Sequence, residues 1–145
     1  MDNSSIARQL YTSWNDRDFD RTAELVADGG EIVLVGSGTR FVGPDGVKEF
    51  DRMWADAFPD GKVEIDELIS AGDTVVVQYT GRGTQTGTLR SPGGDIPATG
   101  RSVTLQLCDV IRLENGKITS LLTYFDSASL LTQLGVMPEA GVATA

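Results

Sequence analysis

The sequence predicts a single α+β domain, because helical segments come first and an antiparallel series of strands follows. Apolar residues recur at helical spacing in the first part of the chain and alternate at strand spacing after about residue 62. A chain of 145 residues has the usual size of one domain, without room for a second core. We therefore expect residues 1–145 to form one unit.

The first expected element is a helix over residues 4–28. Ile6, Leu10 and Trp14 recur at four-residue spacing and place one apolar stripe on it. The polar residues 15–18 interrupt this helix, and Asp18 or Asp20 can then cap a second short helix. The pair Gly29-Gly30 is expected to end the second helix, since glycine adopts the left-handed conformation without a steric penalty.

A short strand at residues 31–35 and a glycine-rich turn at residues 36–38 are expected next. Gly43-Pro44-Asp45 then begins another helix, with proline in its first turn and a carboxylate near its positive end. This helix carries Phe50 and Trp54 on one face and is expected to end near residues 58–61. The rest of the chain is predicted to form strands, except for a wide loop at 88–100 and a final helix at 127–134. The predicted strands cover residues 63–70, 74–80, 102–114 and 117–125, with a two-residue hairpin turn at Asn115-Gly116.

Composition limits the partners that this domain can bind. Twelve basic and 21 acidic residues give a formal charge of -9, which repels phosphate backbones and anionic lipids. We therefore expect neither a nucleic acid nor a membrane as partner. The first residues lack the basic and apolar segments of a signal peptide, and the single cysteine, Cys108, cannot form an internal disulfide. These features indicate a cytoplasmic protein.

The absence of histidine restricts the chemistry further. Without imidazole, the chain cannot form a Ser-His-Asp triad, a Cys-His pair or a His-ligated zinc site. Any reaction must use carboxylates, hydroxyls and amides, and we expect neither a cofactor nor a metal.

Asp109 is the strongest candidate for a catalytic residue. Strand alternation places it in a row with four aliphatic side chains, namely Val103, Leu105, Leu107 and Ile111. Burial among such neighbours raises the pKa of a carboxyl group, and a protonated acid can then donate near neutral pH. Two alternatives are a surface aspartate at a twist of the strand, or one paired with Arg112 across a bulge.

Aromatic residues on the two predicted long helices are candidates for the pocket wall. Trp14, Phe50 and Trp54 would by default belong to the core, but in a fold with an open mouth they can line a cavity. Three tyrosines can donate a hydrogen bond to a carbonyl ligand, but the sequence does not show which of them face inward: Tyr11, Tyr79 and Tyr124.

Nearly the whole chain resembles the SnoaL-like polyketide cyclases, also described as ester cyclases. The resemblance rests on several motifs, which are Thr99-Gly100-Arg101, Asp109-Val110-Ile111-Arg112, Asn115-Gly116-Lys117-Ile118, Asp126 and Gln133-Leu134-Gly135. Residues 15–19, 43–50 and 71–73 also match the habits of this family. The resemblance implies a cone-shaped fold of the nuclear-transport-factor-2-like superfamily, in which a curved antiparallel sheet wraps around N-terminal helices and encloses a pocket.

The same resemblance implies different roles for individual positions. Asp109 stands where aldol-condensing cyclases place a pocket histidine and where ketosteroid isomerases place a protonated aspartic acid. Thr123 stands where the cyclases carry their catalytic aspartate, so that base is absent. Leu10 and Val33 occupy the isomerase tyrosine and base positions, which argues against the familiar steroid isomerisation. Gln78 is expected to supply an amide hydrogen bond to the site, beside the wall residue Leu107.

These observations favour a cofactor-independent cyclase or isomerase that acts on a hydrophobic, polyketide-like carbonyl compound. In this hypothesis Asp109 serves as an acid or as a donor to a developing enolate, while Thr123 and Gln78 orient polar groups. Two alternatives stay open, a non-catalytic small-molecule-binding domain and an epoxide-hydrolase-like enzyme. The resemblance also implies a homodimer, in which the convex face of the sheet pairs two subunits.

Overall fold

The computed structural model describes residues 2–91 and 93–137 of the chain. Its helices are α1 (Asn3–Asn15), α2 (Phe19–Glu24), α3 (Gly43–Ala57) and α4 (Ser127–Gln133). Its strands are β1 (Val26–Leu34), β2 (Thr39–Val42), β3 (Lys62–Ala71), β4 (Thr74–Thr84), β5 (Ser102–Glu114) and β6 (Lys117–Phe125).

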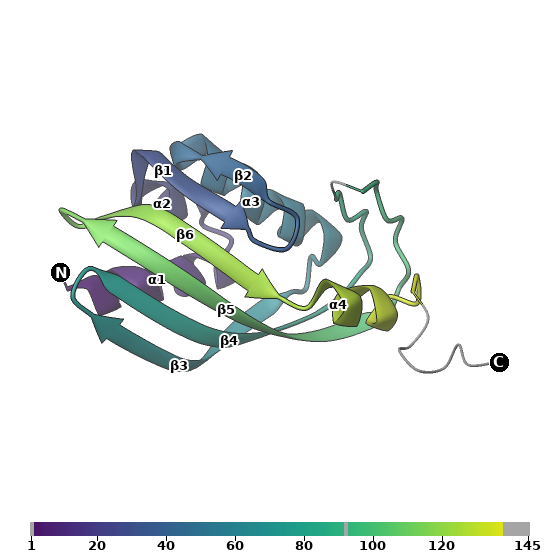
Figure 1. Cartoon of the computed structure of the whole chain (residues 1–145). Helices are drawn as coiled ribbons and strands as arrows, with labels where there is room; N and C mark the ends of the chain where they lie inside the picture. The colour runs from purple at the N-terminus through teal and green to yellow at the C-terminus, as the bar shows by residue number, and fades with distance from the viewer. Residues whose placement is uncertain (1, 92, 138–145) are drawn as a thin grey trace.

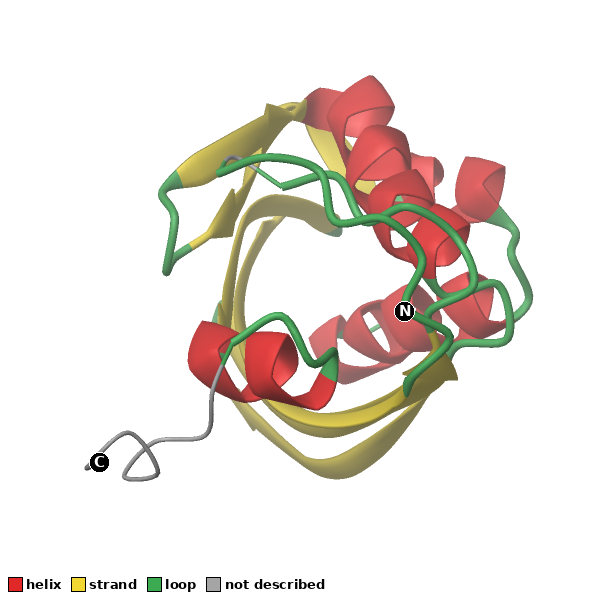
Figure 2. Cartoon of the chain, turned by 90° about the vertical axis from the view of Figure 1, so that its right-hand side faces the viewer, coloured by secondary structure: helices red, strands yellow, loops and turns green. Residues whose placement is uncertain are grey.

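The six strands form one curved, unclosed sheet in the order β2-β1-β6-β5-β4-β3 (Figure 1). Figure 2 shows the strands as a bent wall, with most of the helices on its inner side. The predicted α+β fold with a curved sheet around N-terminal helices is therefore confirmed.

Local sequence accounts for most of the helix ends. The Asp18 side chain accepts a hydrogen bond from the Arg21 backbone and caps α2, and Asp126 caps α4 in the same way. Pro44 lies in the first turn of α3, where its missing N–H costs no helical hydrogen bond. Gly135, with a φ of 76°, follows the end of α4 as predicted.

The predicted end of the second helix is wrong. Helix α2 stops at Glu24, and β1 already begins at Val26, before the glycine pair. A Cβ atom on Gly30 would lie 2.7 Å from the carbonyl oxygen of Ile118 on β6. Gly30 therefore permits close approach of two strands at an irregularity in their register, and it does not terminate a helix.

The sheet also differs from a pure antiparallel meander at its far edge. Strand β1 pairs in parallel with β6, and the short strand β2, which we did not predict, pairs antiparallel with β1. This pairing brings the N-terminal part of the chain back onto the last long strand. The same pairing holds α3, which follows β2 directly, next to β1 and β2 (Figure 1).

Two hydrophobic clusters surround the space between the helices and the sheet. One cluster joins α1 to the central strands through residues such as Ile6, Leu10 and Ile111. The other joins the end of α3 to α4 and β5 through Phe58, Leu105 and other residues. The cavity lies where the clusters meet, since residues of both line it.

The outer face of the sheet mixes polar and apolar side chains, as the sequence predicted for β5. Gln106 and Arg112 are exposed there, Cys108 and Val110 are half-buried, and Tyr124 of β6 is exposed. None of the described helices is long and apolar enough to cross a membrane.

We predict that this outer face pairs two copies of the chain in solution, because it combines apolar contact area with polar groups that can bond across a symmetric interface. Light scattering at micromolar concentration should give twice the 15.5 kDa mass of the chain. Val110→Lys should reduce that mass to a monomer's, and a wild-type protein that is already monomeric would contradict the prediction.

Candidate functional site

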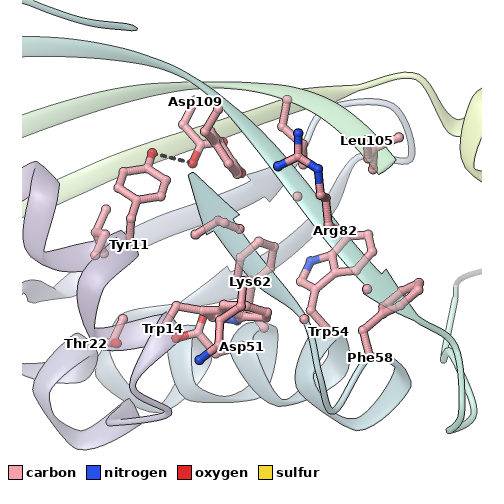
Figure 3. Close-up of a pocket in the computed structure, with 18 of the residues that line it drawn as sticks. Tyr11, Trp14, Thr22, Asp51, Trp54, Phe58, Lys62, Arg82, Leu105 and Asp109 are labelled. Carbon is pink, nitrogen blue, oxygen red and sulfur yellow. Dashed lines mark hydrogen bonds between the residues drawn. The ribbon is translucent and has the colours of Figure 1, made fainter. Parts of the chain in front are cut away.

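A cavity of about 120 Å³ lies between the helices and the concave face of the sheet (Figure 3). This volume is many times the roughly 10–15 Å³ that one water molecule requires, so the cavity can hold an organic ligand. Its wall is mostly apolar. Among the residues that line it are the aromatic side chains predicted from the sequence, Trp14, Phe50 and Trp54, together with Leu107.

Asp109 lies on the concave face of β5, in the row of apolar residues that the alternation predicted. Only 4% of the residue is exposed. The Tyr11 hydroxyl donates to Asp109 Oδ2 at 2.7 Å, and the Tyr79 hydroxyl donates to Oδ1 at 3.1 Å. The carboxyl group therefore accepts one hydrogen bond on each oxygen and keeps a lone pair on each for a ligand.

Burial raises the pKa of Asp109 to about 6, while the hydroxyls of Tyr11, Thr123 and Tyr79 act in the opposite direction. Asp109 is therefore mostly ionised at pH 7, although it takes up a proton much more readily than an exposed aspartate. Its alternative partner from the sequence, Arg112, is exposed and donates to Thr74 instead.

The two inward-facing tyrosines hold the carboxylate in place. Tyr11 comes from α1 and Tyr79 from β4, and their ring centroids are 4.9 Å apart. Burial, and then the negative charge of Asp109, raises the pKa of both tyrosines well above its ordinary value. Both hydroxyls therefore stay protonated as donors. The third tyrosine, Tyr124, lies on the outer face.

Asp51 is a second buried carboxyl group in the cavity wall, and we did not predict it. It follows Val47 by one helical turn and precedes Trp54 by three residues, so all three lie on the cavity side of α3. Only 4% of Asp51 is exposed, and its Oδ2 atom has no hydrogen-bond partner. A carboxylate among apolar residues at helical spacing was the signal that could have identified it.

Burial raises the pKa of Asp51 to about 8. The positive charge of Arg17 opposes this rise, and the negative charge of Asp109 adds to it. At pH 7 the site therefore holds one carboxyl group that is mostly ionised and one that is mostly protonated. Acid–base enzymes use pairs of this kind, in which the surroundings push the pKa values of two titratable groups apart.

Thr123 lies opposite Asp109 in the register between β5 and β6. It is buried but does not belong to the cavity wall. Its hydroxyl favours the ionised form of Asp109, although the contact between them lies outside normal hydrogen-bond geometry. The structure thus places Thr123 as a neighbour of the carboxylate and not as a group that touches a ligand.

Gln78 does not lie in the site, contrary to the sequence-based expectation. It is exposed on the outer face of β4, where it pairs in register with Cys108. Its neighbour Tyr79 points into the cavity, and alternate residues of a strand face opposite sides. The same alternation had already placed Cys108 on the face opposite Asp109, so the sequence contained the information needed to exclude Gln78.

Substitution of Trp54 can show whether the aromatic wall of the cavity binds a ligand or only fills the core. Its ring packs against Phe58 and meets Phe125 edge-on, with centroids 5.6 Å apart. We predict that Trp54→Ala weakens ligand binding, measured by tryptophan fluorescence quenching through Trp14, more than it lowers stability. Phe125→Ala is the matched control, because Phe125 contacts Trp54 but does not line the cavity. A loss of roughly 3–5 kcal/mol in the stability of Trp54→Ala, without a specific loss of binding, would favour a core role.

The arrangement suits chemistry that moves protons in an apolar environment. Lys62 and Arg82 also line the cavity, but both residues are exposed. Within residues 2–91 and 93–137, no group of three or more His, Cys, Asp or Glu side chains could hold a metal ion.

Solved structures with the same fold include two proteins described as putative polyketide cyclases. A putative SnoaL-like polyketide cyclase from Jannaschia sp. CCS1 is 22% identical, with a TM-score of 0.81 over 94% of this chain and 93% of that one. IdmH, a putative polyketide cyclase from Streptomyces antibioticus, is 27% identical, with a TM-score of 0.75 over 92% and 98%. TerC, co-crystallised with polyporic acid, is 23% identical, with a TM-score of 0.72 over 92% and 98%.

A search of the curated proteins finds no match to this chain. The model of the family described as SnoaL-like polyketide cyclase, however, matches residues 4–134, which include every residue of the site and all helices and strands except the first residue of α1, Asn3. The chain belongs to the SnoaL-like polyketide cyclase family.

Proposed function

We propose that this protein is a cofactor-independent cyclase that closes a ring in a hydrophobic, polyketide-like carbonyl compound. The observation that carries the proposal is the carboxylate of Asp109 in an apolar cavity, held by the hydroxyls of Tyr11 and Tyr79. Family membership and the similarity to IdmH support a cyclase-like role. The substrate and the reaction steps are part of the proposal.

Asp109 serves as the general base in this proposal. It removes a proton from a carbon atom next to a substrate carbonyl, and the resulting enol or enolate attacks a second carbonyl of the same molecule. The two tyrosines position the carboxylate, and a pKa of about 6 keeps it ionised but basic at pH 7. The sequence suggested an acid at this position; two hydroxyl donors on the carboxyl oxygens suit a base better, because a carboxylate can accept both bonds.

The apolar wall provides the second part of the catalytic effect. An enclosed cavity holds a flexible chain with its reacting atoms close together, which converts an unlikely encounter into a frequent one. Exclusion of water also strengthens the interactions between the charged and polar groups in the site.

A non-catalytic binding domain is the second candidate. It is favoured by Thr123, which stands at the position where the cyclases that this sequence resembles carry their catalytic aspartate. In that case the cavity would bind a similar compound without changing it, and Asp109 would only anchor the ligand.

The two candidate functions predict different rates of proton exchange next to the carbonyl group of a simple ketone. We suggest β-tetralone, a bicyclic aromatic ketone, in deuterium oxide, with incorporation of deuterium next to the carbonyl followed by NMR. A cyclase that forms enols should exchange this proton faster than buffer alone, in proportion to protein concentration. Binding that quenches the tryptophans without faster exchange would contradict the catalytic proposal and favour the binding domain.

A further inference from the structure

Asp51 is the one buried carboxyl group of the cavity that the proposed base mechanism leaves without a role. It belongs to α3, on the helix side of the cavity, whereas Asp109 belongs to β5 on the sheet side (Figure 3). Among the buried side-chain polar atoms of the described residues, only Asp51 Oδ2 and Thr123 Oγ1 lack a hydrogen-bond partner. Burying an unpaired polar atom is costly, so a group that contributes only to folding would be expected to have a partner.

The hydroxyl hydrogens around Asp51 are used elsewhere. Ser13 Oγ lies 2.6 Å from the carbonyl oxygen of Gln9, which can only accept, so the Ser13 hydrogen lies in that bond. Thr22 Oγ1 lies 2.7 Å from Ser13 Oγ and 3.3 Å from the carbonyl oxygen of Asp18, so the Thr22 hydrogen has two acceptors other than Asp51. Thr22 would favour an ionised Asp51 only if its hydrogen pointed at the carboxylate, and that hydrogen is already used. The arrangement of the Ser13 and Thr22 hydroxyl groups therefore favours an Asp51 that is itself protonated.

The charged and titratable groups around Asp51 are few. Arg17, in the turn between α1 and α2, contributes a positive charge, but its guanidinium donates to the carbonyl oxygens of Trp14, Phe58, Pro59 and Gly61. Asp109 on β5 contributes a negative charge, and Asp51 in turn acts on the phenol of Tyr79. Lys62 lines the same cavity from β3 but donates to the carbonyl oxygen of Asn15. None of the ion pairs among the described residues includes Asp51.

We propose that Asp51 is a second catalytic residue, which donates a proton to the carbonyl oxygen of the substrate while Asp109 removes one from the adjacent carbon. This inference rests on the proposed function and assigns the substrate a carbonyl oxygen directed at α3 and an acidic C–H bond directed at β5. The site also selects uncharged ketones over carboxylate-bearing ligands, because the negative charge of Asp109 would repel an anion in the same cavity.

The step balances without a further reactant. The C–H bond breaks, its proton moves to Asp109, and its electron pair forms the carbon–carbon double bond of the enol. The carbonyl oxygen takes the proton of Asp51 and becomes the enol hydroxyl. When the enol carbon attacks the second carbonyl, a carbon–carbon bond forms, Asp51 recovers its proton from the enol oxygen, and Asp109 gives its proton to the new alkoxide. Both carboxyl groups return to their starting forms.

Asp51→Asn is the decisive variant, because it keeps the shape and the neutrality of the side chain and removes the transferable proton. We expect exchange of β-tetralone to fall by roughly 10² or more, the usual scale for loss of a general acid. Quenching of the tryptophans by β-tetralone should be nearly unchanged. Glu49→Gln, which alters an exposed carboxyl group on the same helix, is the control and should exchange at the wild-type rate.

The pH profile separates a catalytic role from a structural one. The wild-type exchange rate should rise with an apparent pKa near 6, as Asp109 ionises, and fall with one near 8, as Asp51 loses its proton. Asp51→Asn should keep the rise and lose the fall. A variant that exchanges at the wild-type rate, or that keeps the alkaline fall, would overturn the inference while leaving the base role of Asp109 intact.

A second measurement keeps the inference testable if β-tetralone does not exchange, which would count against the proposed function. Infrared difference spectra at pH 7 should show the carbonyl band of a protonated carboxylic acid, absent in Asp51→Asn, that shifts when β-tetralone binds. Absence of that band in the wild type, or a band that does not respond to saturating β-tetralone, would overturn the assignment of Asp51 as donor.

Discussion

Asp51→Asn is expected to be more stable than the wild type at pH 8 and above, by roughly 3–6 kcal/mol. The folded protein holds a proton on Asp51 up to a pKa of about 8, whereas the unfolded chain releases it near the ordinary value of 3.8. Each unit between these two values corresponds to roughly 1.4 kcal/mol. The asparagine side chain has no ionisable proton, so the variant does not lose this free energy.

The direction of the pH dependence follows from the same values. Below about pH 4 Asp51 is protonated in both states, and the wild type and the variant should have similar stability. As pH rises from about 4 to 8, the unfolded state binds fewer protons than the folded state, and the free energy of unfolding of the wild type falls. Above pH 8 both states are ionised, and the difference between the two proteins should stay constant.

Chemical denaturation of both proteins between pH 4 and pH 9 measures this difference. Glu49→Gln should follow the wild-type curve apart from the small effect of one surface charge. If the difference between Asp51→Asn and the wild type does not grow with pH, Asp51 is ionised in the folded protein and has a partner that compensates its charge.

Asp109→Asn is expected to lower proton exchange and ring closure by roughly 10² or more, because the amide cannot act as a base at pH 7. Its geometry should stay close to that of the wild type, since an asparagine oxygen can still accept from Tyr11 or Tyr79. The pKa of Asp109 is also raised, so the wild type loses stability between about pH 4 and pH 6. The variant should therefore be as stable as the wild type or more stable above pH 6.

The tyrosines provide the matched comparison for this variant. Tyr79→Phe removes the longer of the two hydrogen bonds and leaves the carboxylate in place. It should raise the pKa of Asp109 and shift the acidic side of the rate profile to higher pH, with a smaller loss of rate than in Asp109→Asn.

Unchanged turnover in Asp109→Asn, with intact binding, would show that Asp109 is an anchor for the ligand and would favour the binding domain.

Local signals in the sequence were sufficient for most of the fold. The hairpin turn at Asn115-Gly116, the helix start at Pro44 and a cap at Asp18 or Asp20 each depend on a few adjacent residues. The structure confirms the first two and places the cap at Asp18. The ends of β1 depend on its pairing with β6, which is distant in the sequence, and β2 in turn depends on its pairing with β1. Glycine can serve either as a helix stop or as a point of close strand contact, so Gly30 could not be interpreted from its neighbours alone.

The sequence could predict those site residues whose position depends on the periodicity of a single strand or helix. Strand alternation placed Asp109 on the apolar face of β5 without any knowledge of its partners. The same reasoning on a helix would have identified Asp51, because it lies in the apolar row with Val47 and Trp54. Tyr11 and Tyr79 could not be assigned, since their convergence on Asp109 depends on how α1 packs against β4 and β5.

A carbon-13 NMR titration of the aspartate side-chain carboxyl groups measures the two pKa values on which the base and acid roles depend, with Asp51→Asn and Asp109→Asn used to assign the signals. We expect one carboxyl group to titrate near pH 6 and to be absent in Asp109→Asn. A second should titrate near pH 8 and be absent in Asp51→Asn. If both groups ionise below about pH 5, the cavity holds two carboxylates at neutral pH, and the division into a base and an acid is contradicted.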